Sequence, residues 1–158
     1  SRKEAINFTT PYHETVYALM VNAGTPYENA ASLADFNGAS VLGQKDTALD
    51  WTIDQIEGVN HLTAVASVPD MIARLAQGTC DAIVINLENS PGYLASNPNF
   101  RVITFPEGEG LDPGFKGACV GLRKSDDTLL NLSNAVLATI GQEQRDQLWD
   151  TALENQPA

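Results

Sequence analysis

The chain has 158 residues, of which 43% are hydrophobic and 18% are charged. This composition is typical of a globular domain that is large enough to bury a core, and it lacks the signature of a disordered chain. The formal net charge of −11 disfavours nucleic-acid partners and direct binding to anionic membranes, although solubility alone is the simpler explanation of the charge.

The first third of the chain reads as short strands, a helical turn and one helix. The turn residues between the apolar runs predict strands at 5–8, 16–21 and 40–43, and a helical turn at 33–36. A helix begins at Thr47, where Thr47 and Asp50 form a T-x-x-D capping pattern. Its apolar stripe ends before Gly58, and we expect one continuous helix between these points.

The rest of the chain continues the alternation of strands and helices. Further strands are expected at 62–66, 81–86, 101–105 and 117–122, and helices at 67–77, 90–94, 125–140 and 143–153. The run Ser67-Val68-Pro69-Asp70 is a clear helix start, and Gly78 ends that helix. Residues 81–86 have an apolar centre without alternation, which indicates a strand covered on both faces, as in a parallel sheet.

Strands that alternate with helices predict an α/β fold with a mostly parallel sheet flanked by helices. Ligands of such sheets bind at the carboxyl ends of strands, next to the following helices. Two segments fit this rule. Residues 43–47 join a strand to the helix at Thr47, and Asn86–Glu88 follow the buried strand.

Three residues offer groups that suit a charged ligand. The helix N-terminus at Thr47 presents N–H groups and a hydroxyl that suit a carboxylate or phosphate, although the G-x-x-x-x-G-K pattern of a P-loop is missing. Asn86 can accept a hydrogen bond from an ammonium group, and Arg2 can hold a carboxylate through two N–H bonds. Each also has a structural role that the sequence alone favours: helix N-cap, strand-end turn and surface arginine.

The sequence predicts no metal, no cofactor and no catalytic group. Cys80 and Cys119 lack the spacing of a zinc or redox site and read as small hydrophobic residues, with a disulfide open in an oxidising compartment. His13 and His61 stand far apart in loop-like contexts, and no nucleophile with a supporting base is evident.

Four stretches of the chain match a pattern of known proteins. Residues 2–12, R-K-E-A-I-N-F-T-T-P-Y, fit the pattern R-x-x-x-(I/V)-x-F-(S/T)-x-P-Y, and further matches lie at 33–56, 68–87 and 145–157. Over nearly its whole length the chain thereby resembles the polar-amino-acid solute-binding proteins of ABC importers, of the periplasmic-binding-protein-like type II fold. The resemblance is to their Gram-positive lipoprotein branch in particular.

The resemblance implies two α/β lobes that are joined by two hinge strands and close on a ligand. It begins at the first hinge, so we expect an incomplete first lobe. Residues 11–114 would form the second, ligand-binding lobe. Residues 1–10 and 115–158 would form the hinge strands and a C-terminal helical remnant of the first lobe.

The same resemblance implies an extracytoplasmic protein of the cell envelope, either an anchored lipoprotein or periplasmic, with its signal peptide removed. It would deliver a polar amino acid to ABC permease subunits and would not be an enzyme. With one wall missing, we expect weak binding or none. A dehydratase-like enzyme on the same fold and the sensor domain of a receptor are the alternatives.

Site roles carry over by position. Arg2 and Thr47 match the residues that hold the ligand α-carboxylate. Asn86 stands where the family has an Asp or Glu for the α-ammonium group, and the loss of this acid also argues against the dehydratase reading. Asp46 stands where Gly or Ser is usual. Gln44 and Glu88 complete the predicted site, and alternation turns Glu88 to the side of Asn86 only if the strand continues.

The C-terminal helices carry an apolar stripe that would normally cover a lobe. Its members are Leu129, Leu132, Val136, Leu137, Ile140, Leu148 and Trp149. Exposing several such side chains costs much of a domain's net stability, so we expect self-association, most simply a homodimer. The alternatives are helices that fold back onto the sheet of the second lobe, or disorder.

Overall fold

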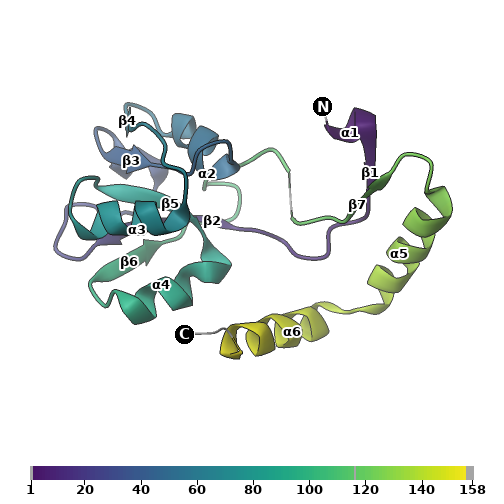
Figure 1. Cartoon of the computed structure of the whole chain (residues 1–158). Coiled ribbons are helices and arrows are strands. Elements are labelled where there is room, and N and C mark those ends of the chain that lie inside the picture. Colours follow the sequence, from purple (N-terminus) through teal and green to yellow (C-terminus); the bar gives the residue numbers. More distant parts are fainter. Residues whose placement is uncertain (1, 116, 156–158) are drawn as a thin grey trace. The chain divides into compact units, whose positions relative to one another are not determined.

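The computed structural model of the chain describes residues 2–115 and 117–155, except for the side chains of residues 2, 3, 153 and 154. The chain divides into two compact units (Figure 1). Val16–Phe115 forms one of them, which we call the central unit. The segments before and after it, 1–15 and 116–158, form the other, which we call the terminal unit.

The central unit is built on a five-stranded sheet in the order β4-β3-β5-β2-β6. In that order, the strands are Asn60–His61, Ser40–Leu42, Ala82–Asn86, Tyr17–Asn22 and Phe100–Ile103. Strands β4, β3 and β5 pair in parallel, whereas β2 pairs antiparallel with both β5 and β6. The prediction of a mostly parallel sheet is therefore correct, except that β2 runs antiparallel to the other four strands. An apolar run reads the same in either direction, so its sequence carries no sign of the reversal.

Helices cover both faces of this sheet. They are η1 (Leu33–Phe36), α2 (Ala48–Trp51), η2 (Thr52–Gln55), α3 (Val68–Ala76), η3 (Leu87–Asn89) and α4 (Ser90–Ser96). Residues of η1, α2 and η2 pack in one apolar cluster, and residues of α3 and α4 pack in the other. Strand β5 contributes Ala82 and Val84 to the first cluster and Ile83 and Ile85 to the second, which confirms that it is covered on both faces.

The helix expected from Thr47 onward is broken into two pieces. Thr47 caps α2 as predicted, and its hydroxyl accepts a hydrogen bond from the Leu49 N–H at 3.2 Å. After α2 the chain tightens into η2, where the Thr52 hydroxyl donates to the carbonyl of Ala48 at 2.7 Å. Such back-bonding of a threonine to the preceding turn bends helices. Asp50, expected in the capping pattern, instead bonds His61.

The segment that precedes α3 differs from its prediction, whereas α3 itself agrees. Only β4, Asn60–His61, is a strand, and the expected strand at 62–66 is reduced to one bridge between Val65 and Gln44. Helix α3 begins as expected, since Ser67 accepts a hydrogen bond from the Asp70 N–H at 3.3 Å. The chain leaves it at Gly78, whose φ of 66° is in the left-handed region.

The terminal unit is held by a two-stranded antiparallel sheet. Strand β1 (Ile6–Phe8) follows the short helix α1 (Arg2–Ala5) and pairs with β7 (Gly121–Arg123). Helices α5 (Asp127–Thr139) and α6 (Gln142–Glu154) follow, where two helices were predicted. None of the described apolar side chains of this unit is buried, so it has no core of its own in the single chain.

One arginine organises the end of α5. The Arg145 guanidinium donates to the carbonyls of Leu137 at 2.7 Å and Tyr12 at 2.5 Å, while its Nε donates to the carbonyl of Ile140 at 3.0 Å. A cation at this place satisfies the free carbonyls of a helix C-terminus. Beside it, the rings of His13 and Trp149 stack at 4.5 Å, and an apolar groove of about 420 Å³ opens.

Candidate ligand-binding site

The parallel pairing of β3 and β5 brings the predicted site together. In this register Val41 lies beside Ala82 and Leu42 beside Ile83, so both strands end at the same edge of the sheet. The loop at 43–47 and the segment Asn86–Glu88 leave from that edge. Five of the six predicted residues therefore share one edge of the central unit: Gln44, Asp46, Thr47, Asn86 and Glu88. The sixth belongs to the terminal unit, and the side chain of Arg2 lies outside the described residues.

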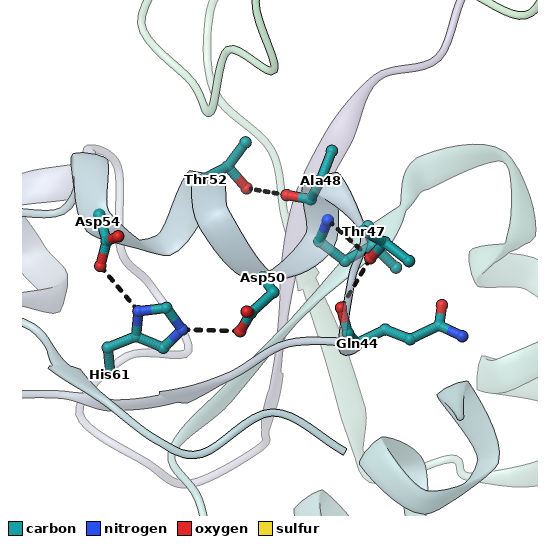
Figure 2. A network of polar contacts seen from close by, with 8 residues as sticks. Gln44, Thr47, Ala48, Asp50, Thr52, Asp54 and His61 are labelled. Carbon is teal, nitrogen blue, oxygen red and sulfur yellow. Dashed lines mark hydrogen bonds and ion pairs between the residues drawn. The ribbon is translucent and has the colours of Figure 1, made fainter. Parts of the chain in front are cut away.

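Hydrogen bonds fix the first loop of the site (Figure 2). The Thr47 hydroxyl donates to the Gln44 carbonyl at 2.8 Å while it caps α2. The Gln44 side chain donates to the Ala66 carbonyl at 3.3 Å, and the Lys45 N–H donates to the Val65 carbonyl at 2.8 Å. The donor capacity of Thr47 is thus used within the loop. Its hydroxyl oxygen keeps one further acceptor position.

Two backbone features shape this loop. Asp46 has a φ of 61°, a left-handed conformation that costs a residue with a side chain roughly 1–2 kcal/mol. Gly43 lies against the backbone of α2, where an added Cβ would clash with the Leu49 carbonyl and the Asp50 Cα. Helix α2 can therefore pack at the end of β3 because residue 43 is a glycine and has no side chain.

Behind the loop, His61 joins β4 to the helices α2 and η2 (Figure 2). Its Nε2 lies 2.8 Å from Asp50 Oδ1, and its Nδ1 lies 2.8 Å from Asp54 Oδ1. Burial lowers the pKa of His61, but the hydrogen bonds and charges of Asp50 and Asp54 outweigh it, so the pKa is raised. Only the imidazolium form donates from both nitrogens.

The pair Asp50 and Asp54 was not recognised in the sequence, although their i, i+4 spacing on a predicted helix was a usable signal. His61 lies at the end of a strand rather than in a loop, and two carboxylates support it. Because both ring nitrogens bond these carboxylates, neither is available to accept a proton from a substrate. The arrangement of His61 is structural.

At the end of β5, Asn86 lies opposite Tyr17 of β2 in the antiparallel register. Asn86 Oδ1 is buried and has no hydrogen-bond partner among the described residues. Burial, and then the charge of Glu88, raises the pKa of Tyr17, and the same two causes raise the pKa of Tyr93. Tyr17 is not among the predicted site residues, although it has the one polar tip in the apolar run at 16–21.

Glu88 does not follow the alternation of β5. The strand ends at Asn86, and Leu87–Asn89 forms the turn η3. Glu88 was expected on the side of Asn86 only if the strand continued, and it does not. Its charge nevertheless acts on Tyr17 and Tyr93, which pack on the two different apolar clusters. Glu88 therefore supplies a negative charge at the edge where the two faces of the sheet meet.

Comparison with known proteins identifies the fold. No family model and no curated protein matches the sequence. Solved structures do match. The substrate-binding protein of an amino acid ABC transporter superposes with a TM-score of 0.75 at 23% identity, over 95% of this chain and 64% of that one. The chain has the fold of these type II periplasmic-binding-protein-like proteins.

Two further structures were solved with ligands. The amino acid ABC transporter substrate-binding protein from Streptococcus pneumoniae Canada MDR_19A bound to L-arginine gives a TM-score of 0.79 at 22% identity, over 99% of this chain and 64% of that one. An ancestral arginine-binding protein bound to glutamine gives 0.72 at 21% identity, over 95% and 64%. The chain spans less than two thirds of the length of these structures.

The remaining predictions concern the cysteines, metal ions and membrane-spanning helices. Cys80 and Cys119 are free thiols, and burial, with the nearby Asp81 charge, raises the pKa of Cys80 to about 11. Within residues 2–115 and 117–155, no group of three histidine, cysteine or acidic side chains could hold a metal ion. Across the same residues, no helix has the length and apolar character to span a bilayer.

Proposed function

We propose that this chain is the substrate-binding component of an amino-acid ABC transporter and binds a polar amino acid at the edge formed by β3 and β5. One observation carries the proposal: the parallel register of these strands places Thr47 and Asn86 at one edge of a substrate-binding-protein fold. The α2 N-terminus suits the ligand carboxylate, and the Asn86 oxygen suits an N–H donor.

The proposal includes the finer expectations from the resemblance. The protein works outside the cytoplasm, as an anchored lipoprotein of the Gram-positive branch or a periplasmic protein, and hands its ligand to permease subunits. Arg2 would contact the ligand carboxylate, and residues 11–114 would be the ligand-binding lobe. At Thr47 the backbone N–H groups of the α2 N-terminus would serve the carboxylate, because the hydroxyl already donates to the Gln44 carbonyl. The engaged His61 supports a binding role rather than catalysis.

Self-association is a further part of the proposal. Four stripe residues are exposed large hydrophobics: Leu129, Leu132, Val136 and Leu148. Together with the lack of a core in the terminal unit, this exposure supports a homodimer that buries the stripe.

The test is a titration of the chain with each of the common amino acids, followed by ¹⁵N-HSQC NMR. We expect at least one amino acid to shift the amide signals of Thr47 and Asn86 with an affinity of about 1 mM. Such weak binding is expected because the family encloses its ligand from two sides. A chain whose spectrum no amino acid changes at tens of millimolar would contradict the proposal.

A further inference from the structure

The side chain of Asn86 is neutral, and an amide binds an ammonium group less strongly than a carboxylate does. The inference that follows rests on the proposed function and concerns the groups around Asn86. Tyr17 is its partner in the β2–β5 pair, and residues directly opposite in such a pair project from the same face of a sheet. That face carries the cluster in which Tyr17 packs with Ala48 and Leu49 of α2.

One polar group on this face lacks the bonds that buried groups normally make. Asn86 Oδ1 is buried without a hydrogen-bond partner among the described residues. Tyr17, directly opposite on β2, is 9% exposed. Buried polar atoms are nearly always paired, so the unsatisfied Asn86 oxygen, with Tyr17 opposite it on the neighbouring strand, indicates a place for a donor from outside the chain.

The electrostatics at this place favour a positive donor. Burial, and then the charge of Glu88, raises the pKa of Tyr17, and a phenol is neutral at about pH 7 in any case. A neutral phenol, an amide oxygen and a carboxylate are all acceptors. Their number matches the three N–H donors of a primary ammonium group.

We propose that Tyr17 is a ligand-contacting residue that receives the ammonium group of the amino acid together with Asn86 and Glu88. In this arrangement the amide and the phenol supply two neutral acceptors, and Glu88 supplies the charge that residue 86 lacks. The site then selects ligands with a free ammonium group although the family's carboxylate is replaced.

The experiment compares free and acetylated ligands. The chain is titrated with L-arginine, L-glutamine and their Nα-acetyl derivatives, and ¹⁵N-HSQC NMR gives each affinity. The variant Tyr17→Phe keeps the buried ring and removes only the hydroxyl. The matched control is Tyr27→Phe, which alters a tyrosine that also packs on this cluster but lies beyond the other end of β2.

We expect Tyr17→Phe to weaken the free amino acids about tenfold, and Tyr27→Phe to leave them unchanged. The acetylated forms should bind more weakly than the free forms and should not respond to Tyr17→Phe. Glu88→Gln, in the turn η3, should give the same pattern without touching the core.

Three results would overturn the inference while leaving the proposed function intact. Tyr17→Phe and Glu88→Gln could leave the free amino acids unaffected, they could weaken free and acetylated forms equally, or the wild-type chain could bind both forms equally well. A wild-type chain that binds no amino acid at all would instead refute the proposed function, and the inference with it.

Discussion

The Cα atom of Asp50 lies 2.5 Å from the point that a side-chain carbon on Gly43 would occupy. Real Cβ atoms do not approach other atoms so closely, so any substitution at residue 43 must push α2 away from β3. Since Thr47 begins α2, the site moves with it. Overpacking of this kind costs about 1–3 kcal/mol.

We therefore expect Gly43→Ala to lower the free energy of unfolding by about 1–3 kcal/mol and to displace the Thr47 amide signal. Urea unfolding and ¹⁵N-HSQC spectra measure the two effects. The control is Gly92→Ala in α4, because a Cβ on Gly92 meets nothing within 4 Å. It should be neutral or stabilising, since alanine is the better helix former. Equal stability of the two variants would contradict this prediction.

The left-handed backbone of Asp46 predicts a stabilising substitution. Asp46→Gly removes the steric cost of φ 61°. Glycine also loses more conformational entropy on folding, which offsets part of this benefit, so the free energy of unfolding should rise by about 0.5–1 kcal/mol. Urea unfolding measures this gain. Asp46→Ala also removes the carboxylate but keeps a Cβ, and it should give no gain. A similar gain from both variants would assign the effect to charge rather than to the backbone.

Restoring a carboxylate at residue 86 should strengthen binding. A charged acceptor is roughly twice as strong as a neutral one, so we expect Asn86→Asp to tighten the binding of an amino acid about tenfold. Without ligand, the same variant should lower the melting temperature, because the added charge is buried without a bond. Asn99→Asp, an exposed position with the same change of charge, should do neither. Unchanged affinity in Asn86→Asp would argue against an ammonium group at this position.

His61 predicts a dependence of stability on pH. Its pKa in the folded chain is raised above the ordinary value of about 6.5, so its contribution is complete below that pH. The contribution is lost as the pH rises through the folded-state pKa. The difference in unfolding free energy between the wild type and His61→Gln should therefore shrink as the pH rises above about 6.5. A difference that grows over this range would mean that the neutral ring is the stabilised form.

The exposed stripe predicts self-association. Leu132 and Val136 are 62% and 52% exposed and lie four residues apart on α5, so they face the same way. We expect a dimer by light scattering at micromolar concentration, and a monomer after Leu132→Asp and Val136→Asp. The circular-dichroism spectrum should keep the signal of the central unit. A wild-type chain that is a monomer with both helices ordered would contradict this prediction.

Local signals in the sequence predicted much of the fold. Ser67, Pro69 and Asp70 set the start of α3 through contacts within one turn, and the unbroken apolar run of β5 showed that both its faces are covered. The edge that carries Thr47 and Asn86 followed from the alternation of strands and helices. These features depend on residues that are near one another in the chain.

Features that depend on distant residues could not be read in this way. The direction of β2 is set by its neighbours β5 and β6, and the bonds of His61 require β4 to lie against α2 and η2. The role proposed for Tyr17 depends on its register with Asn86, which lies on another strand. Such pairings cannot be predicted from a single sequence, because hydrophobic periodicity and turn signals are local.

The distribution of the core has a consequence for the order in which the chain folds. Among the residues whose side chains the structure describes, all the buried apolar ones belong to the uninterrupted stretch Val16–Phe115, whereas β1 and β7 pair across that whole stretch. Closing a loop of this length before its interior is ordered has an entropic cost that so small a sheet cannot offset. The central unit should thus form first, and the β1–β7 ladder afterwards. In hydrogen exchange, the amides of Asn7 and Leu122 should open without the global unfolding that exposes Val84.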